Sequence, residues 1–115
     1  MRTWNRTAVV VVSPSKPFLD WLHSVDPASA NFALADLSQD PTVYLLAESG
    51  SDSEANNHLA KACERIFEEQ LNAWYRAPAH WPQDRSIKNF ARWFTYSLHS
   101  MIVDLCDDPP VVEDL

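Results

Sequence analysis

The clearest pattern in the chain is a continuous apolar run near its start. Residues 7–12 read TAVVVV, and Ser13-Pro14 ends the run. A short β-branched run without polar alternation is typical of a strand that is covered on both faces. We therefore predict that this segment is the central strand of a sheet and is buried on both sides.

The next apolar residues recur at helical spacing. Pro17 suits the first turn of a helix, where a missing N–H costs no hydrogen bond. Apolar positions then repeat every three or four residues from Phe18 to Val25, and Asp-Pro at residues 26–27 ends the pattern. Residues 28–41 mix apolar and turn-forming side chains, and we expect a packed connection there.

A second strand is predicted at residues 42–48, TVYLLAE, between Pro41 and a serine-rich turn. A strand, a helix and another strand in succession suggest a right-handed parallel crossover. We expect the core to include Val9, Val11, Leu19, Leu22, Val43, Leu45, Leu59, Ile66, Phe67, Phe90, Phe94 and Ile102.

The longest helix is predicted over residues 53–75, where apolar positions form one stripe opposite a charged face. Ser51 and Glu54 have the spacing of a capping box at its start. A third helix begins at Ser86, and a last strand follows at residues 97–105. The order β-α-β-α-α-β predicts an α+β fold with a small three-stranded sheet covered by amphipathic helices.

Composition fits one domain. The chain has 115 residues, of which 46% are hydrophobic and 22% are charged, so a single core is feasible without disulfides or a structural metal. We expect one α+β domain over residues 1–106 and an acidic, flexible tail over residues 107–115.

Several classes of protein are excluded by the scarcity of glycine. Gly50 is the only glycine in the chain, whereas the Walker loop, the dinucleotide-binding fingerprint and the α/β-hydrolase elbow each need at least two. No turn motif presents a nucleophile either. We therefore expect no catalytic residues and no cofactor.

Charge and cysteine usage indicate the compartment and the kind of partner. The net charge of −7 disfavours binding to duplex nucleic acid. The apolar run is far shorter than the ~20 residues of a membrane span, and we see no export signal. Cys63 and Cys106 lack C-x-x-C spacing, and the four histidines are scattered. We expect a cytoplasmic protein with reduced thiols, no membrane contact and no bound metal.

One segment stands apart from this acidic background. Residues 73–96 hold seven of the 13 aromatic residues, with four cationic side chains and one carboxylate, a local charge of +3. Tryptophan and arginine are over-represented at the energetic centres of interfaces. The binding residues predicted in this segment are Arg76, His80, Trp81, Asp84, Arg85 and Arg92.

Arg85 is the sharpest candidate, because a cation just before the start of a helix faces the positive end of the helix dipole. One explanation is a ligand, with Arg85 gripping a carboxylate or phosphate while Trp81 stacks on it. The other is structural, with Arg85 paired to Glu69 or Asp104 to hold the loop. We favour the structural explanation.

Several motifs together resemble a known pattern. The chain reads S-P-x-x-P-F-L-D-W-L at residues 13–22, W-P-x-D-R at 81–85, F-x-x-W-F at 90–94 and H-S-M-I-x-D-L at 99–105. This pattern is similar to that of a family of short bacterial proteins to which no activity is assigned. The resemblance implies a single compact bacterial domain and adds no chemistry.

The favoured function is therefore a non-catalytic protein-interaction module that uses the aromatic and basic surface between Trp74 and Trp93. Its partner would be an unknown protein or a second copy of the chain. The alternative is a small-anion-binding protein or an enzyme with a pocket at residues 76–85, in which His80 or His99 acts as acid or base. Single-stranded nucleic acid is the weakest of the candidate ligands, because the chain is acidic.

Overall fold

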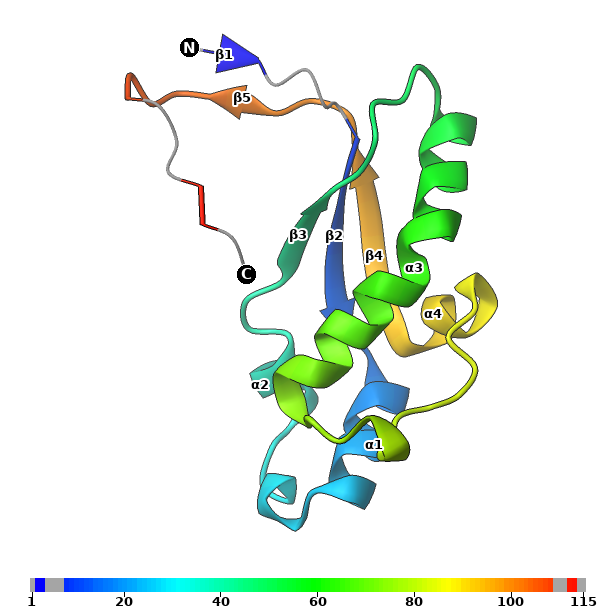
Figure 1. The fold of residues 1–115 in the computed structure, drawn as a ribbon. Coiled ribbons are helices and arrows are strands. Elements are labelled where there is room, and N and C mark those ends of the chain that lie inside the picture. Colours follow the sequence, from blue (N-terminus) through cyan, green and yellow to red (C-terminus); the bar gives the residue numbers. More distant parts are fainter. Residues whose placement is uncertain (1, 4–7, 109–111, 114–115) are drawn as a thin grey trace.

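A computed structural model describes residues 2–3, 8–108 and 112–113, and they form an α+β fold (Figure 1). The main sheet has the order β3-β2-β4, and β1 and β5 form a separate two-stranded ribbon. The elements in chain order are β1 (Arg2–Thr3), β2 (Val9–Pro14), α1 (Lys16–Val25), a 3₁₀ turn (Pro27–Ser29), α2 (Leu34–Leu37), β3 (Thr42–Leu45), α3 (Asp52–Trp74), a second 3₁₀ turn (Pro78–His80), α4 (Ile87–Trp93), β4 (Phe94–His99) and β5 (Val103–Asp104).

The predicted central strand is confirmed as β2, although residue 7 of the predicted range lies outside the described residues. The predicted parallel crossover is wrong, because β3 runs antiparallel to β2. Thr42 pairs with Val12, so β3 starts at the end of the sheet where β2 stops. In Figure 1, α1 lies beyond that end of the sheet and does not carry the chain back across its face.

The long helix is confirmed as α3, and Ser51 caps its start by accepting a hydrogen bond from the Glu54 N–H at 3.2 Å. The Glu54 carboxylate accepts from the Gly50 N–H, so the predicted capping box is completed one residue earlier than expected.

The C-terminal elements also differ from the prediction. The third helix ends at Trp93, and the last strand starts at Phe94, three residues before its predicted start, because Phe94 pairs with Pro14 in the sheet.

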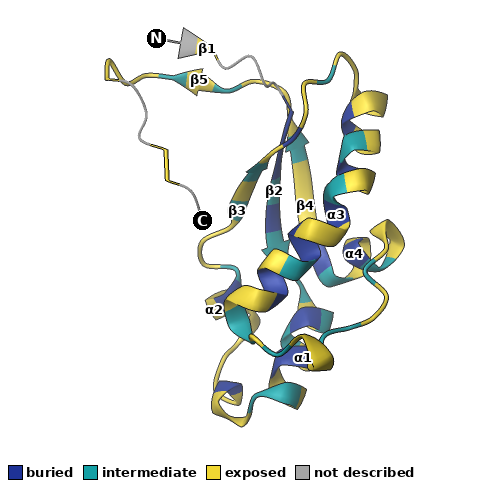
Figure 2. Cartoon of the chain, viewed as in Figure 1, coloured by how far each residue is buried: buried dark blue, intermediate teal, exposed yellow. Residues whose placement is uncertain are grey.

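The main hydrophobic cluster lies on the face of the sheet that carries Val10 and Val12. Val10 and Val12 of β2 are buried against the helices, and four phenylalanines complete the centre of the core (Figure 2). These phenylalanines are Phe18, Phe67, Phe90 and Phe94. Figure 1 shows the helices on this face and at one end of the sheet. On the opposite face of β2, Val9 is buried and Val11 is half-buried, so the predicted burial on both faces is complete only on the helix face.

Two residues predicted in the core are exposed. Val43 is 57% exposed and Leu45 is 54% exposed. Their neighbours Thr42 and Tyr44 face α3, where the Gln70 side chain bonds to both. Because successive strand residues point to opposite faces, Val43 and Leu45 lie on the uncovered face.

Beyond β4 the chain leaves the sheet. Residues 100–108 extend past the end of the sheet and pair with β1 through β5 (Figure 1). In the predicted tail, Asp107, Asp108, Val112 and Glu113 are exposed, whereas residues 109–111 and 114–115 lie outside the described residues. The predicted flexibility of the tail stays a prediction.

Candidate functional site

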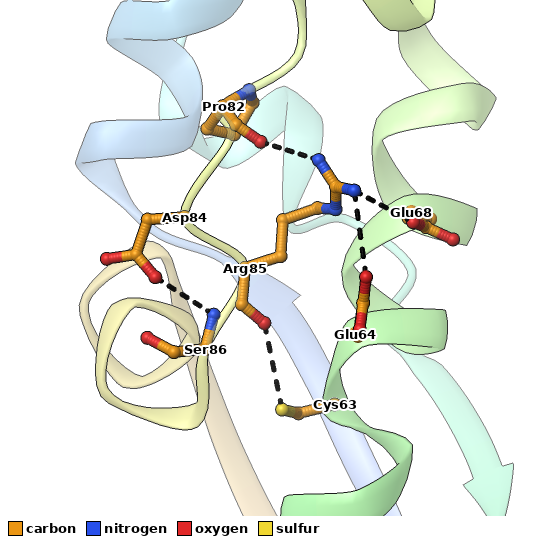
Figure 3. Close-up of polar contacts among 7 residues, drawn as sticks. All are labelled: Cys63, Glu64, Glu68, Pro82, Asp84, Arg85 and Ser86. Carbon is orange, nitrogen blue, oxygen red and sulfur yellow. Dashed lines mark hydrogen bonds and ion pairs between the residues drawn. The ribbon is translucent and has the colours of Figure 1, made fainter.

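Arg85 is held by contacts within the chain (Figure 3). Its Nη1 donates to the Pro82 carbonyl at 2.8 Å, and its Nη2 lies 3.1 Å from Glu68 and 3.7 Å from Glu64. The partners therefore differ from the predicted Glu69 or Asp104. Positions 64 and 68 are one helical turn apart and face the loop together, whereas Glu69 lies on the β3 side of α3, where it bonds to Tyr44.

Two tryptophans tie the same loop to the body of the protein. Trp81 donates its indole N–H to the Tyr75 carbonyl at 2.8 Å, and Trp21 of α1 donates to the His80 carbonyl at 2.8 Å. The ring of Trp93 packs 5.5 Å from Phe67, within the aromatic cluster. Several aromatics of residues 73–96 are thus used in packing.

Asp84 organises the start of α4. Its Oδ1 accepts from the Ser86 N–H at 3.1 Å, and Ser86 Oγ accepts from the Asn89 N–H at 3.4 Å. The hydrogen bonds from Ser86 lower the pKa of the Asp84 carboxyl group, with smaller contributions from the nearby cations Arg92 and Lys88. The carboxylate is therefore stabilised in its charged form as part of the helix cap.

The other predicted binding residues are at the surface. Arg76, His80 and Arg92 are exposed, while Trp81 and Arg85 are half-buried and engaged as described above. The binding role of the six residues stays a prediction.

The surface between β3 and α3 combines a depression, charged side chains and backbone groups that the sheet does not use. Two adjoining hollows of about 240 and 350 Å³ run between β3 and α3. They share Leu45, Leu46, Ala62 and Arg65, so they form one continuous depression, which we call the β3–α3 groove. Its remaining lining residues are Tyr44, Ala47, His58, Lys61, Ile66 and Glu69.

The groove is apolar at its floor and cationic along its helix side. Leu46 and Ile66 are buried and form part of the floor. Lys61 and Arg65 are exposed and one helical turn apart on α3, and His58 lies three residues before Lys61. This side of the groove therefore attracts negative charge.

A hydrogen-bond network closes one end of the groove. Tyr44 donates to the Glu69 carboxylate, and the buried Gln70 amide donates to Tyr44 Oη at 2.8 Å and to Thr42 Oγ1 at 3.0 Å. Burial raises the pKa of Tyr44 above its ordinary value, and the hydrogen bond to Glu69 raises it further. The phenol is thus a neutral donor that keeps Glu69 in place.

The outer edge of β3 carries backbone groups that β2 does not use. The Leu46 N–H donates to the Ala8 carbonyl at 2.9 Å, one position beyond the Val9–Leu45 pair and in the same register. Antiparallel ladders alternate, so Tyr44 and Thr42 also turn their backbone groups toward β2. Val43 and Leu45 turn theirs outward, at the edge of the sheet as the described residues build it.

The sequence carried weak signals for this groove. Lys61 and Arg65 fall on the polar face of a predicted helix, which resembles any solvated face. Alternation in TVYL puts Val43 and Leu45 on one face, but it does not show which face the helices cover.

Scans against protein-family models, curated proteins and solved structures each find no match to this chain. Across the described part of the chain, no helix combines the length and apolar composition that a membrane crossing needs. Within the same residues, no three His, Cys, Asp or Glu side chains are grouped to hold a metal ion.

Proposed function

We propose that this protein is a non-catalytic protein-interaction module that binds an extended, acidic segment of a partner protein as an added strand along β3. The observation that carries the proposal is the coincidence of an outward-facing strand edge with a groove beside it. Val43 and Leu45 offer the backbone groups, and the β3–α3 groove receives alternate side chains of the bound segment. Strand addition of this kind derives its affinity from main-chain hydrogen bonds and its specificity from pockets.

Charge selects the segment. The cations Lys61 and Arg65 lie along the helix side of the groove. The Glu69 carboxylate at the other end is already bonded to Tyr44. A bound segment with carboxylates over α3 and apolar side chains over Val43 and Leu45 therefore complements both faces of the edge.

The surface between Trp74 and Trp93 has less support as the docking site. Trp81 and Trp93 are half-buried and packed, and the Arg85 guanidinium is bonded to Glu68 and Pro82. An anion clamp at Arg85 would first have to break these contacts. We therefore keep the proposed class of function and assign it to the β3–α3 groove.

The charge requirement is tested with a fluorescent peptide that alternates valine and aspartate, measured by anisotropy against one that alternates valine and lysine. At chain concentrations too low for two copies to associate, the double variant Lys61→Gln/Arg65→Gln is expected to bind the aspartate peptide about tenfold more weakly than the unmodified chain. The matched control is Lys88→Gln/Arg92→Gln on α4, which removes the same charge elsewhere and is expected to bind normally. Equal binding of both peptides, or equal loss in both variants, would contradict the proposal.

The strand-addition requirement is tested with Val43→Pro. Proline at this position removes an outward N–H and leaves the β2–β3 ladder intact, as proline at edge positions does. Peptide binding should fall while the circular dichroism spectrum is unchanged. Undiminished binding by a folded Val43→Pro variant would argue against an added strand.

A further inference from the structure

The segment that leaves β4, residues 100–108, is the second unusual feature of the molecule, and we call it the arm. Among the described residues, two pairs join it to β1, Arg2 with Asp104 and Thr3 with Val103. The radius of gyration is 15.7 Å, whereas a compact chain of this length has about 13 Å. An arm that projects from the body fits this difference (Figure 1).

One side of the arm is apolar and exposed. Met101 is 74% exposed, Val103 42% and Leu105 78%. Alternate residues of an extended chain share a side, so these three side chains form one strip. Strips of exposed apolar side chains mark interaction sites more often than isolated exposed residues do.

The arm is also acidic. It reads SMIVDLCDD and contains three aspartates and no cation. The helix side of the β3–α3 groove carries the cations Lys61 and Arg65 and one carboxylate, Glu69, which is bonded to Tyr44. The chain therefore contains both a strand-edge groove and an extended segment of the opposite charge.

We infer that the arm of a second copy occupies the β3–α3 groove, giving a reciprocal dimer in which each arm adds a strand to the other copy's β3. This inference rests on the proposed function and names the partner. Pairing with Val43 and Leu45 places the apolar strip of the arm on the uncovered face of the sheet, beside those two side chains. Asp104, whose Oδ1 accepts a hydrogen bond from the Cys106 N–H at 2.8 Å, then lies on the other side of the added strand, over the groove and toward Arg65.

A second copy fits better than the arm of the same chain. Leu45, Val9 and His99 lie in one row across the sheet, so the arm starts at the end of the sheet where β3 stops. The two outer strands are separated by β2, a distance of about 10 Å. To run along its own β3, the arm would have to bend back alongside β3, whereas it runs past the ends of β2 and β3 and continues away from the sheet (Figure 1). Reciprocal exchange needs no such turn and has the self-complementary form of a two-fold interface.

The test is the molar mass of the full chain by sedimentation equilibrium. We expect twice the 13.1 kDa of one chain. The variant Met101→Asp/Leu105→Asp charges the apolar strip at exposed positions and should have the mass of one chain. The control Val112→Asp changes a residue that is 82% exposed outside the arm and should stay dimeric.

A mixing experiment identifies the two surfaces. Lys61→Gln/Arg65→Gln retains its arm, and Met101→Asp/Leu105→Asp retains its groove, so a mixture can form one intact contact. We expect a species of twice the chain mass in the mixture at concentrations where each variant alone has the mass of one chain. A dimer that the arm variant leaves intact would overturn the inference, since pairing of two β3 edges needs no arm.

Peptide binding separates failure of this inference from failure of the proposed function. If the unmodified chain has the mass of one chain and binds the valine–aspartate peptide, the second copy is not the occupant, and the interaction module stands. Tighter peptide binding by the monomeric arm variant than by a monomeric unmodified chain would show that the arm occupies its own groove and would overturn the dimer. If neither dimer nor peptide complex forms, both proposals fail.

Discussion

Trp21 on α1 donates its indole N–H to the carbonyl oxygen of His80 at 2.8 Å, although 59 positions separate the two residues. A short distance along the same loop, Trp81 donates to the Tyr75 carbonyl. The loop between α3 and α4 is thus fixed by side chains that reach its backbone. Trp81, within the aromatic segment at residues 73–96, therefore helps to hold the loop in place.

The indole hydrogen bond of Trp81 should be measurable in stability. Trp81→Phe keeps an aromatic ring and removes the N–H, so the free energy of unfolding should fall by about 1 kcal/mol more than in Trp74→Phe. Trp74 is the control, because it is also half-buried and its ring packs against Phe32. Chemical denaturation measures both, and equal losses would contradict a role for the Trp81 N–H.

Arg85 should contribute to stability through the loop. Arg85→Ala removes the bonds to Pro82 and Glu68 and leaves the Glu68 carboxylate without its cation. We expect a loss of about 1 to 2 kcal/mol in the free energy of unfolding, reduced by the partial exposure of the pair. The exposed Arg92 is the control, and Arg92→Ala should change stability by less than about 0.5 kcal/mol. Equal losses in the free energy of unfolding in the two variants would contradict the structural role of Arg85.

Tyr44 links stability to pH. Its folded pKa is raised by burial and by the bond to Glu69, so the unfolded chain loses the phenol proton first. The contribution of Tyr44 is therefore complete below the unfolded pKa of about 10 and declines as the pH rises above it.

Denaturation curves between neutral and alkaline pH, recorded for the unmodified chain and Tyr44→Phe, check this dependence. Tyr44→Phe should be less stable by about 1 to 2 kcal/mol at neutral pH, because the buried Gln70 loses an acceptor. The difference in free energy of unfolding between the two proteins should become smaller above about pH 10. A difference that stays constant or grows with pH would contradict the hydrogen-bond network of Tyr44, Glu69 and Gln70.

The two thiols should differ in reactivity. Cys63 is 3% exposed, and burial raises its pKa, whereas Cys106 is exposed on the arm. In Cys106→Ser, the remaining thiol should react with an aromatic disulfide reagent only as fast as the protein opens. Rapid reaction under native conditions would show that Cys63 is more accessible than its position indicates.

Much of the fold could be predicted from periodicity, because α3, β2 and α1 carry long and regular patterns. The face of the sheet that the helices leave uncovered could not be predicted, because the alternation in TVYL is compatible with either side. The orientation of β3 depends on Val12 meeting Thr42, a contact set by the path of the intervening connection. The position of Arg85 before a helix predicts that it has a partner. Which carboxylates it meets depends on how α3 is rotated against the loop, so Glu64 and Glu68 could not be predicted.

The most direct test of the β3–α3 groove is amide hydrogen exchange at Val43 and Leu45, followed by NMR in the monomeric arm variant Met101→Asp/Leu105→Asp. Their N–H groups point outward from β3, whereas that of Tyr44 is bonded to β2. Addition of the valine–aspartate peptide should slow exchange at Val43 and Leu45 and leave Tyr44 unchanged. Binding without protection at these two amides would contradict strand addition along β3.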